Sequence, residues 1–194
     1  MFDGDSENEY KRIISGEIKP RHVAKRFVIG RGCGIVTLGG ALALPGRDIA
    51  DFLSNGVECV AAAATLGAEA DRLLERFRLK SISEAYTLEI MLNDTIERYL
   101  DGVQAGLGLG YGARFSPGYG DFPLSVQPGL LDMLDARRAI GLSCTREYIL
   151  TPRKSITAII AANVKPPGCG TCIKRDGCAL RERGNRCGNF GTGE

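Results

Sequence analysis

The sequence predicts an α+β fold, with a mainly antiparallel sheet, a long helix packed against it and a small cysteine-rich tail. Three observations lead to this prediction. Residues 57–65 are apolar apart from Glu58 and the terminal Thr65, which is typical of a buried central strand. Across residues 81–103 apolar side chains recur at three- and four-residue steps, which predicts a long helix with one buried face. Residues 165–194 contain a cluster of cysteines among Gly, Lys and Arg.

Composition limits the classes of function. The chain has 194 residues, 44% of them apolar, so it can form a sizeable core. Its 25 basic and 23 acidic residues nearly balance, so no broad basic face for nucleic acid is expected. The first residues lack a secretory signal, and the longest weakly polar run, residues 59–68, is too short to span a bilayer. We expect a soluble, cytoplasmic protein without a membrane partner.

The first part of the chain is divided by glycine and proline. Residues 1–20 are polar and show no clear period, which predicts a frayed N-terminal segment. Short apolar runs bounded by glycine predict strands at 26–30 and 34–39. A Pro-Gly turn then leads into a short helix predicted at 46–55, followed by the central strand at 57–65.

The second part is predicted to alternate helices with a long loop. A helix is expected at 68–78 and another at about 128–139, on either side of the long helix and a glycine-dense loop at 105–123. A loop of this length inside a compact domain is usually functional. Segments 141–150 and 155–163 are predicted to pair as a closing hairpin. The Lys-Pro-Pro-Gly sequence that follows predicts a boundary between a domain at 1–164 and a tail at 165–194.

The loop holds candidate binding residues. Arg114 carries a planar guanidinium suited to a carboxylate. Pro117 and Gly118 form a tight turn, and glycine lets a ligand approach the backbone closely. Four aromatic residues offer ring faces for an adenine or a sulfonium group: Tyr111, Phe115, Tyr119 and Phe122. These residues indicate either a site for an amino-acid-like or nucleoside-like ligand or an ordered loop with structural aromatics.

The pattern Arg-x-x-Pro-Gly-Tyr-x-x-x-Pro resembles the S-adenosylmethionine-binding signature of the activation domain of cobalamin-dependent methionine synthase. It consists of Arg114, Pro117, Gly118, Tyr119 and Pro123. The segments 59–77, 81–101 and 130–161 are similar to the strand, helices and closing region of that family, so the likeness covers roughly residues 30–163. The chain would be a stand-alone short form of this domain.

The resemblance implies a module that binds S-adenosylmethionine and supports reductive methylation of cob(II)alamin. Arg114 would bind the methionyl carboxylate, and the Pro117-Gly118-Tyr119 turn would supply backbone contacts. Ser155 and Thr157 match the family's hydroxyl pair. Glu97 either accepts hydrogen bonds from the ligand's ammonium or ribose or lies on a solvated helix face. Because the sulfonium is already activated, the protein needs to position it and requires no general base.

The resemblance also implies partners. The chain lacks a cobalamin-binding Asp-x-His-x-x-Gly motif, so the cobalamin would be held by a separate methionine synthase or another corrinoid protein. A flavodoxin-like or ferredoxin-like protein would donate the electron. The chain would then be the activation subunit of a methyltransferase and not a complete enzyme. Two alternatives remain: an adaptor that docks on a corrinoid protein without binding S-adenosylmethionine, and an iron–sulfur electron carrier that reactivates corrinoid proteins.

The cysteines fall into two groups. Four thiols can satisfy tetrahedral zinc or hold a [4Fe–4S] cluster, and in the tail they are Cys169, Cys172, Cys178 and Cys187. The alternative is a redox-active or disordered tail. Three isolated thiols lie among apolar or small residues and are expected to be inert core residues: Cys33, Cys59 and Cys144. His22 is the only histidine, which excludes multi-histidine metal sites.

Overall fold

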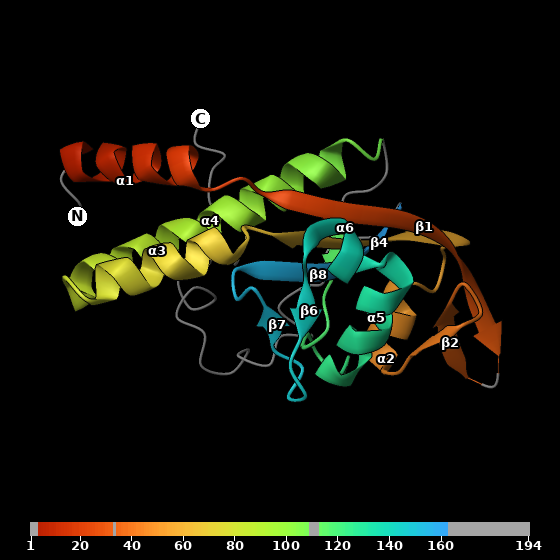
Figure 1. Cartoon of the computed structure of the whole chain (residues 1–194). Helices are drawn as coiled ribbons and strands as arrows, with labels where there is room; N and C mark the ends of the chain where they lie inside the picture. Colours follow the sequence, from red (N-terminus) through yellow and green to blue (C-terminus); the bar gives the residue numbers. More distant parts are fainter. Residues whose placement is uncertain (1–3, 33, 109–112, 163–194) are drawn as a thin grey trace, which may run out of the picture.

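A computed structural model describes residues 4–32, 34–108 and 113–162. Within these residues six strands form one antiparallel sheet in the order β3-β2-β1-β4-β8-β5 (Figure 1). The strands are β1 (Arg21–Gly32), β2 (Ile35–Leu38), β3 (Leu42–Leu44), β4 (Glu58–Thr65), β5 (Ala113–Phe115) and β8 (Ser155–Ala161). A separate ladder pairs β6 (Ser143–Cys144) with β7 (Leu150–Thr151). The predicted α+β class is confirmed.

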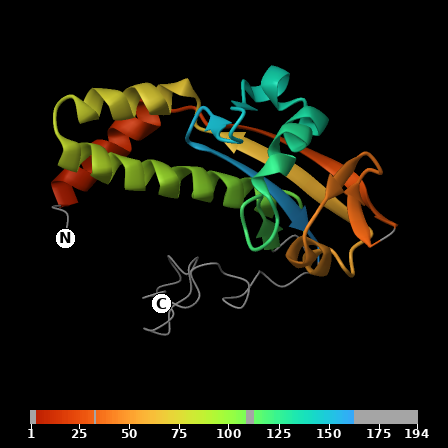
Figure 2. The same cartoon turned by 90° about the horizontal axis from the view of Figure 1, so that it is seen from below.

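Helices cover both faces of the sheet. One face is packed by α1 (Gly4–Glu17), α3 (Ala68–Arg78) and α4 (Ile82–Ala105). The other face is packed by α2 (Arg47–Phe52), the 3-10 turn η1 (Leu124–Val126), α5 (Gln127–Leu134) and α6 (Ala136–Ile140). Figure 2 shows α1, α3 and the first half of α4 extending together beyond one end of the sheet. We call this part the helical lobe.

Strand β4 lies in the middle of the sheet and is buried on both faces. Residues 59–64 read Cys-Val-Ala-Ala-Ala-Ala, and all six are buried. Alternate side chains point to opposite faces, so Ala61 and Ala63 contact the α5 side while Ala62 and Ala64 contact the α4 side. Burial raises the pKa of the Cys59 thiol to about 12, as expected for an inert core cysteine.

The long helix begins and ends close to the predicted positions. The Ser81 hydroxyl accepts a hydrogen bond from the backbone N–H of Glu84 at 3.3 Å and caps α4 at its N-terminus. Leu88, Leu92 and Leu100 are buried along one side of the 24-residue helix. The helix predicted at 68–78 is also present, as α3. Both helices are therefore set by apolar periodicity that the sequence displays.

Other predictions about local structure were wrong. The N-terminal segment is helical from residue 4 to 17, because Tyr10, Ile13 and Ile14 share one side of α1 and pack into the core. The predicted hairpin does not form. Segment 155–161 joins the main sheet between β4 and β5, where its apolar side chains are buried, whereas β6 and β7 pair with each other.

Two further boundaries differ from prediction. The helix predicted at 128–139 is divided into α5 and α6 at Asp135, which adopts a left-handed backbone with φ 55°. The glycine-dense loop contains a short strand, β5, at residues 113–115. In the described parts of the chain, no helix has the length and apolar character needed to cross a membrane.

A buried lysine joins the sheet to the long helix. Lys154 lies immediately before β8, and its side chain is 10% exposed. Its Nζ donates to Glu89 Oε1 at 3.0 Å and to Asn93 Oδ1 at 2.7 Å. The hydrogen bond from Lys154 lowers the pKa of the Glu89 carboxyl. Both acceptors are on α4, so Lys154 ties the start of β8 to the middle of this helix.

We predict that the Lys154–Glu89 contact stabilises the fold in a pH-dependent way. The lowered pKa of Glu89 means that its contribution is complete above the ordinary carboxyl pKa and is lost as the pH falls through the lowered value. Glu89→Gln should therefore lower the free energy of unfolding by about 1–3 kcal/mol at neutral pH and by much less at pH ~3. Urea unfolding at both pH values measures this. An equal loss at both would contradict the prediction.

Candidate functional site

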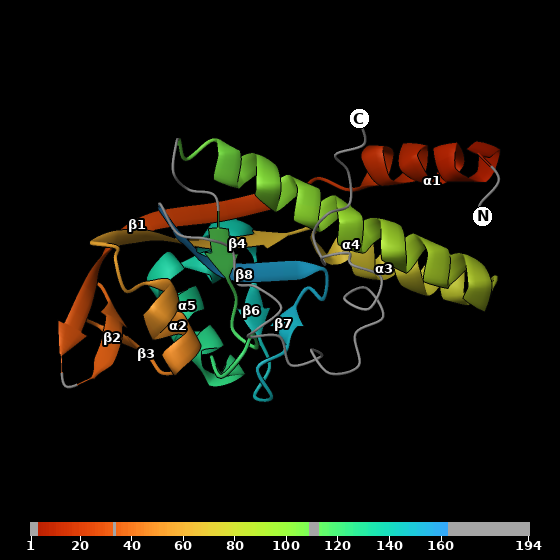
Figure 3. The same cartoon turned by 180° about the vertical axis from the view of Figure 1, so that it is seen from behind.

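Arg114 lies between the edge of the sheet and the long helix. It is the central residue of β5 and pairs with Ile160 of β8, whose side chain packs on the α4 side. Its Nη1 donates to Asp101 Oδ1 at 2.5 Å and its Nη2 donates to Glu97 Oε2 at 2.5 Å. The side chain is 22% exposed, while both carboxylates are more exposed. Figure 3 shows α4 passing across this face of the sheet. The result is one cation held between two anions at a half-open edge.

Ser155 and Thr157 lie on the opposite face of the sheet from Arg114. Alternation along β8 places them with Ile159, on the face packed by α5. The Thr157 hydroxyl is buried and donates to Gln127 Oε1 at 2.7 Å. The Ser155 hydroxyl lies 2.8 Å from that of Thr65 and 2.6 Å from the carbonyl oxygen of Pro152. The structure therefore does not bring this pair together with Arg114.

The Pro-Gly-Tyr turn is closed by its own backbone. The N–H of Gly118 donates to the carbonyl of Phe122 at 2.7 Å, and the N–H of Tyr119 donates to that of Ser116 at 3.1 Å. Gly118 has φ +94°, a left-handed conformation that favours glycine. Pro117 is buried, whereas Tyr119 is exposed. The turn thus presents Tyr119 at the surface on a rigid support.

Aromatic packing fixes this turn to the core. The Phe115 ring contacts those of Phe52, Tyr119 and Phe122 at centroid distances of 5.4, 5.9 and 6.1 Å. Phe115 follows Arg114 directly, so its side chain points to the opposite face of β5. Tyr119 is therefore associated with the Phe115 side of the strand. Phe115 and Phe122 are buried, which fits the alternative that these two loop aromatics are structural.

Asp121 connects the loop to the start of α2. Its carboxylate accepts from the backbone N–H groups of Arg47 at 2.7 Å and Asp48 at 3.0 Å, and the Asp48 carboxylate accepts from the N–H of Asp121 at 3.1 Å. The N–H of Arg47, followed by that of Asp48, lowers the pKa of the Asp121 carboxyl. A Cβ at Gly120, where φ is +52°, would overlap the Asp48 carboxylate. This close approach requires glycine.

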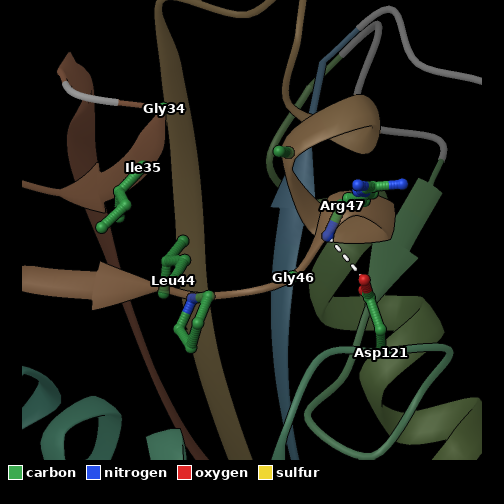
Figure 4. A pocket seen from close by; sticks show the side chains of 8 residues that line it. Gly34, Ile35, Leu44, Gly46, Arg47 and Asp121 are labelled. Atoms are coloured by element: carbon green, nitrogen blue, oxygen red, sulfur yellow. Dashed lines mark hydrogen bonds between the residues drawn. The ribbon is translucent and has the colours of Figure 1, made fainter.

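A pocket of about 300 Å³ opens beside this junction (Figure 4). Ile35, Leu44 and Ala50 contribute apolar walls, and Arg47 and Asp121 lie at its polar edge. Leu44 belongs to the core on the α5 face, so the pocket is not on the face that carries Arg114. The pocket and the Arg114 cluster are therefore separate features.

Sequence reasoning identified Arg114 and Glu97 but missed two acidic residues, Asp101 beside Arg114 and Asp121 beside α2. Asp101 follows Glu97 by four residues, which places both on one side of a helix, so the sequence contained a signal for it. Asp121 gave no signal, because its role depends on the approach of α2 from far along the chain. Glu97 does not simply lie on a solvated face, since it forms an ion pair with Arg114.

The predicted metal ligands Cys169, Cys172, Cys178 and Cys187 lie outside the described residues, as do Cys33 and Tyr111. Among residues that the structure does describe, no group of three or more His, Cys, Asp or Glu side chains is placed to hold a metal ion. His22 Nδ1 lies 2.8 Å from the Tyr99 hydroxyl, so the single histidine packs against α4.

Comparison with known proteins supports the fold. No protein-family model and no curated protein sequence matches the chain. Among solved structures, the crystal structure of the MetH reactivation domain bound to AdoHcy matches with a TM-score of 0.56 and 15% sequence identity. The match covers 93% of this chain and 71% of that chain. At this identity the likeness shows the fold alone: the chain has the mixed helix and antiparallel-sheet fold of the MetH reactivation domain.

We predict that the loop depends on the close contact at Gly120. Gly120→Ala should lower the free energy of unfolding by at least about 2 kcal/mol, because it adds both left-handed strain and a clash with Asp48. Gly40→Ala is a matched control, since Gly40 has φ +71° but open space around it. It should cost about 1 kcal/mol. Urea unfolding compares the two, and equal losses would show that the Asp48 contact is unimportant.

Proposed function

We propose that the chain binds S-adenosylmethionine at Arg114 and supports reductive methylation of cob(II)alamin on a separate cobalamin-dependent methionine synthase or related corrinoid protein. The observation that carries this proposal is the Arg114 cluster, on a fold of which one solved example, the MetH reactivation domain, was crystallised with AdoHcy. The proposed contribution of this chain is to bind and orient the methyl donor.

The cluster is complementary to an α-amino acid. The methionyl end of S-adenosylmethionine carries a carboxylate and an ammonium on one carbon. Arg114 offers a guanidinium for the carboxylate, and Glu97 and Asp101 offer acceptors for the ammonium. Each carboxylate already uses one guanidinium nitrogen, so ligand binding would exchange these ion pairs for new ones. We therefore include Asp101 in the proposed site.

The Pro117-Gly118-Tyr119 turn and the β8 hydroxyls enter the proposal in different ways. Tyr119 is exposed and lies on the Phe115 side of β5, so it would offer a ring face to the sulfonium or the adenine of a ligand that extends from Arg114 around this edge strand. Ser155 and Thr157 are hydrogen-bonded on the opposite face. Their assignment as ligand contacts is tested by Ser155→Ala and Thr157→Val, which should weaken S-adenosylmethionine binding if they touch it.

The proposed chemistry requires positioning more than acid–base catalysis. S-adenosylmethionine would supply an activated methyl group, which is transferred to cobalt once the corrinoid has been reduced by one electron, and S-adenosylhomocysteine would be the leaving group. Arg114, Glu97 and Asp101 would fix the methionyl end so that the methyl group faces the partner's corrinoid. A flavodoxin-like or ferredoxin-like protein would supply the electron. We propose that the chain acts in the cytoplasm.

The Cys-rich tail forms a second part of the proposal. Four clustered thiolates repel one another, so a cation is needed to stabilise them together. A [4Fe–4S] cluster would relay an electron toward cobalt, whereas zinc would be structural. If the chain binds a cluster but not S-adenosylmethionine, the electron-carrier alternative applies. If it binds neither, the adaptor alternative applies.

We predict that Arg114→Ala weakens S-adenosylmethionine binding by roughly tenfold to a hundredfold, because a charge-assisted contact is lost. Arg98→Ala is the matched control, since Arg98 forms an exposed ion pair with Asp94 on the same helix. The affinity of the Arg98→Ala variant for S-adenosylmethionine should equal that of the wild type. Isothermal titration calorimetry measures both, with circular dichroism to check folding. Equal affinity for wild type and Arg114→Ala would remove Arg114 from the site.

We predict that the anaerobically prepared protein holds one metal centre through Cys169, Cys172, Cys178 and Cys187. A [4Fe–4S] cluster absorbs visible light and bleaches on reduction, while zinc is detected by elemental analysis. Serine at any of the four positions should reduce the metal content. Truncation after Pro167 should abolish metal binding and leave the domain at 1–164 folded. Neither metal in stoichiometric amount would show that the ligand assignment is wrong.

A further inference from the structure

The helical lobe exposes a row of large apolar side chains. Leu79 lies in the turn between α3 and α4, and Ile82, Tyr86 and Ile90 follow along α4. Their relative exposures are 89%, 84%, 66% and 44%. We call these four residues the apolar row. Single exposed apolar residues are ordinary on a protein surface, but four in a continuous line are typical of an interface.

The position of the row leaves one side of the lobe uncovered. The opposite side of α4 packs through Leu88 and Leu92 into the core formed with α1 and α3. Because the lobe extends beyond the end of the sheet, the first turns of α4 project past the strands that the structure describes (Figure 2). A partner that covered the apolar row would meet a helix, not a pocket.

The row is arranged so that a second copy fits it. Ile82, Tyr86 and Ile90 are spaced four residues apart, so they form one ridge with Tyr86 at its centre. A two-fold axis beside Tyr86 would place Ile82 against Ile90 of the second copy, and Tyr86 against Tyr86 of that copy. An isologous contact requires this kind of self-complementarity.

Charge favours the same arrangement. Lys80 is exposed six residues before Tyr86, and Asp94 is exposed eight residues after it. Antiparallel packing about Tyr86 brings Asp94 of one copy to the α3–α4 turn of the other, where Lys80 lies. Asp94 is paired with Arg98 at 2.8 Å, but an exposed pair of this kind contributes little and can exchange. Within one chain about 18 Å of helix separates Ile82 from Asp94, so Lys80 and Asp94 can meet only between copies.

From these observations we infer that the apolar row is the interface of a homodimer in which the α4 helices of two copies pack antiparallel about Tyr86. The inference does not depend on the ligand at Arg114. A contact centred on one helix pair is small compared with the roughly 800 Å² per partner of a standard stable interface. The dimer should therefore be reversible and dissociate on dilution through the micromolar range.

Sedimentation velocity of the full chain under reducing conditions tests the interface. The wild type should shift from monomer to dimer as its concentration rises through the micromolar range. The double variant Ile82→Glu, Ile90→Glu should weaken dimerisation at least roughly tenfold, because charges would face each other across a desolvated contact. Val57→Glu is the control, because Val57 is also exposed but lies outside the lobe. The dimerisation constant of this variant should equal that of the wild type. A wild-type monomer at all concentrations, or an unchanged dimer in the double variant, overturns the inference.

A charge exchange tests the geometry. Lys80→Glu and Asp94→Lys should each weaken the dimer by placing like charges together, and the two changes combined should restore it. Circular dichroism confirms that each variant is folded. A combined variant that is weaker than either single variant, or single variants with no effect, would show that Lys80 and Asp94 do not meet, and would overturn the antiparallel arrangement.

Discussion

Strand β4 is buried on both faces, and its place in the middle of the sheet sets where the other elements can lie. Its alanines fill little volume, so helices pack close to the sheet on both sides. One side receives α4 and the other receives α5 and α6. The strands β1 and β8 complete its hydrogen bonds, and β8 in turn pairs with β5, the edge strand that carries Arg114. A larger side chain at Ala62 would push α4 away, and Glu97 and Asp101 would move with it.

The Arg114 guanidinium needs anionic partners in the protein, and the same partners compete with a ligand. A guanidinium that is mostly buried needs anionic partners, and α4 provides two of them. A ligand that uses the same guanidinium has to compete with these carboxylates or join them. The arrangement therefore favours ligands that bring both charges, because a carboxylate alone would be repelled by Glu97 and Asp101 while an ammonium alone would be repelled by Arg114.

The sequence predicted the elements whose apolar residues repeat regularly and missed those that depend on distant partners. The central strand was predicted because Ala61 lies in a continuous apolar run, and α3 and α4 were predicted because Leu74 and Leu92 belong to clear periodic patterns. The pairing of β8 with β4 was not predicted. No local feature of the sequence distinguishes a strand that pairs with β4 from one that pairs with the segment just before it in the chain. Arg114 was recognised because it belongs to a local sequence motif, whereas Asp121 was not recognised. Its carboxylate gains its role only when α2 packs beside the loop.

The continuity of α4 has a thermodynamic consequence. This one unbroken helix carries Tyr86 in the lobe and Glu97 beside Arg114, about 16 Å apart along its axis. A helix resists bending over three turns, so a shift of either end is felt at the other. If a ligand replaces the ion pairs of Arg114 and displaces α4, that displacement also changes the free energy with which a partner packs on the helical lobe. Linkage would then be reciprocal: a ligand that changes the self-association constant by some factor has its own affinity changed by the same factor when the chain associates.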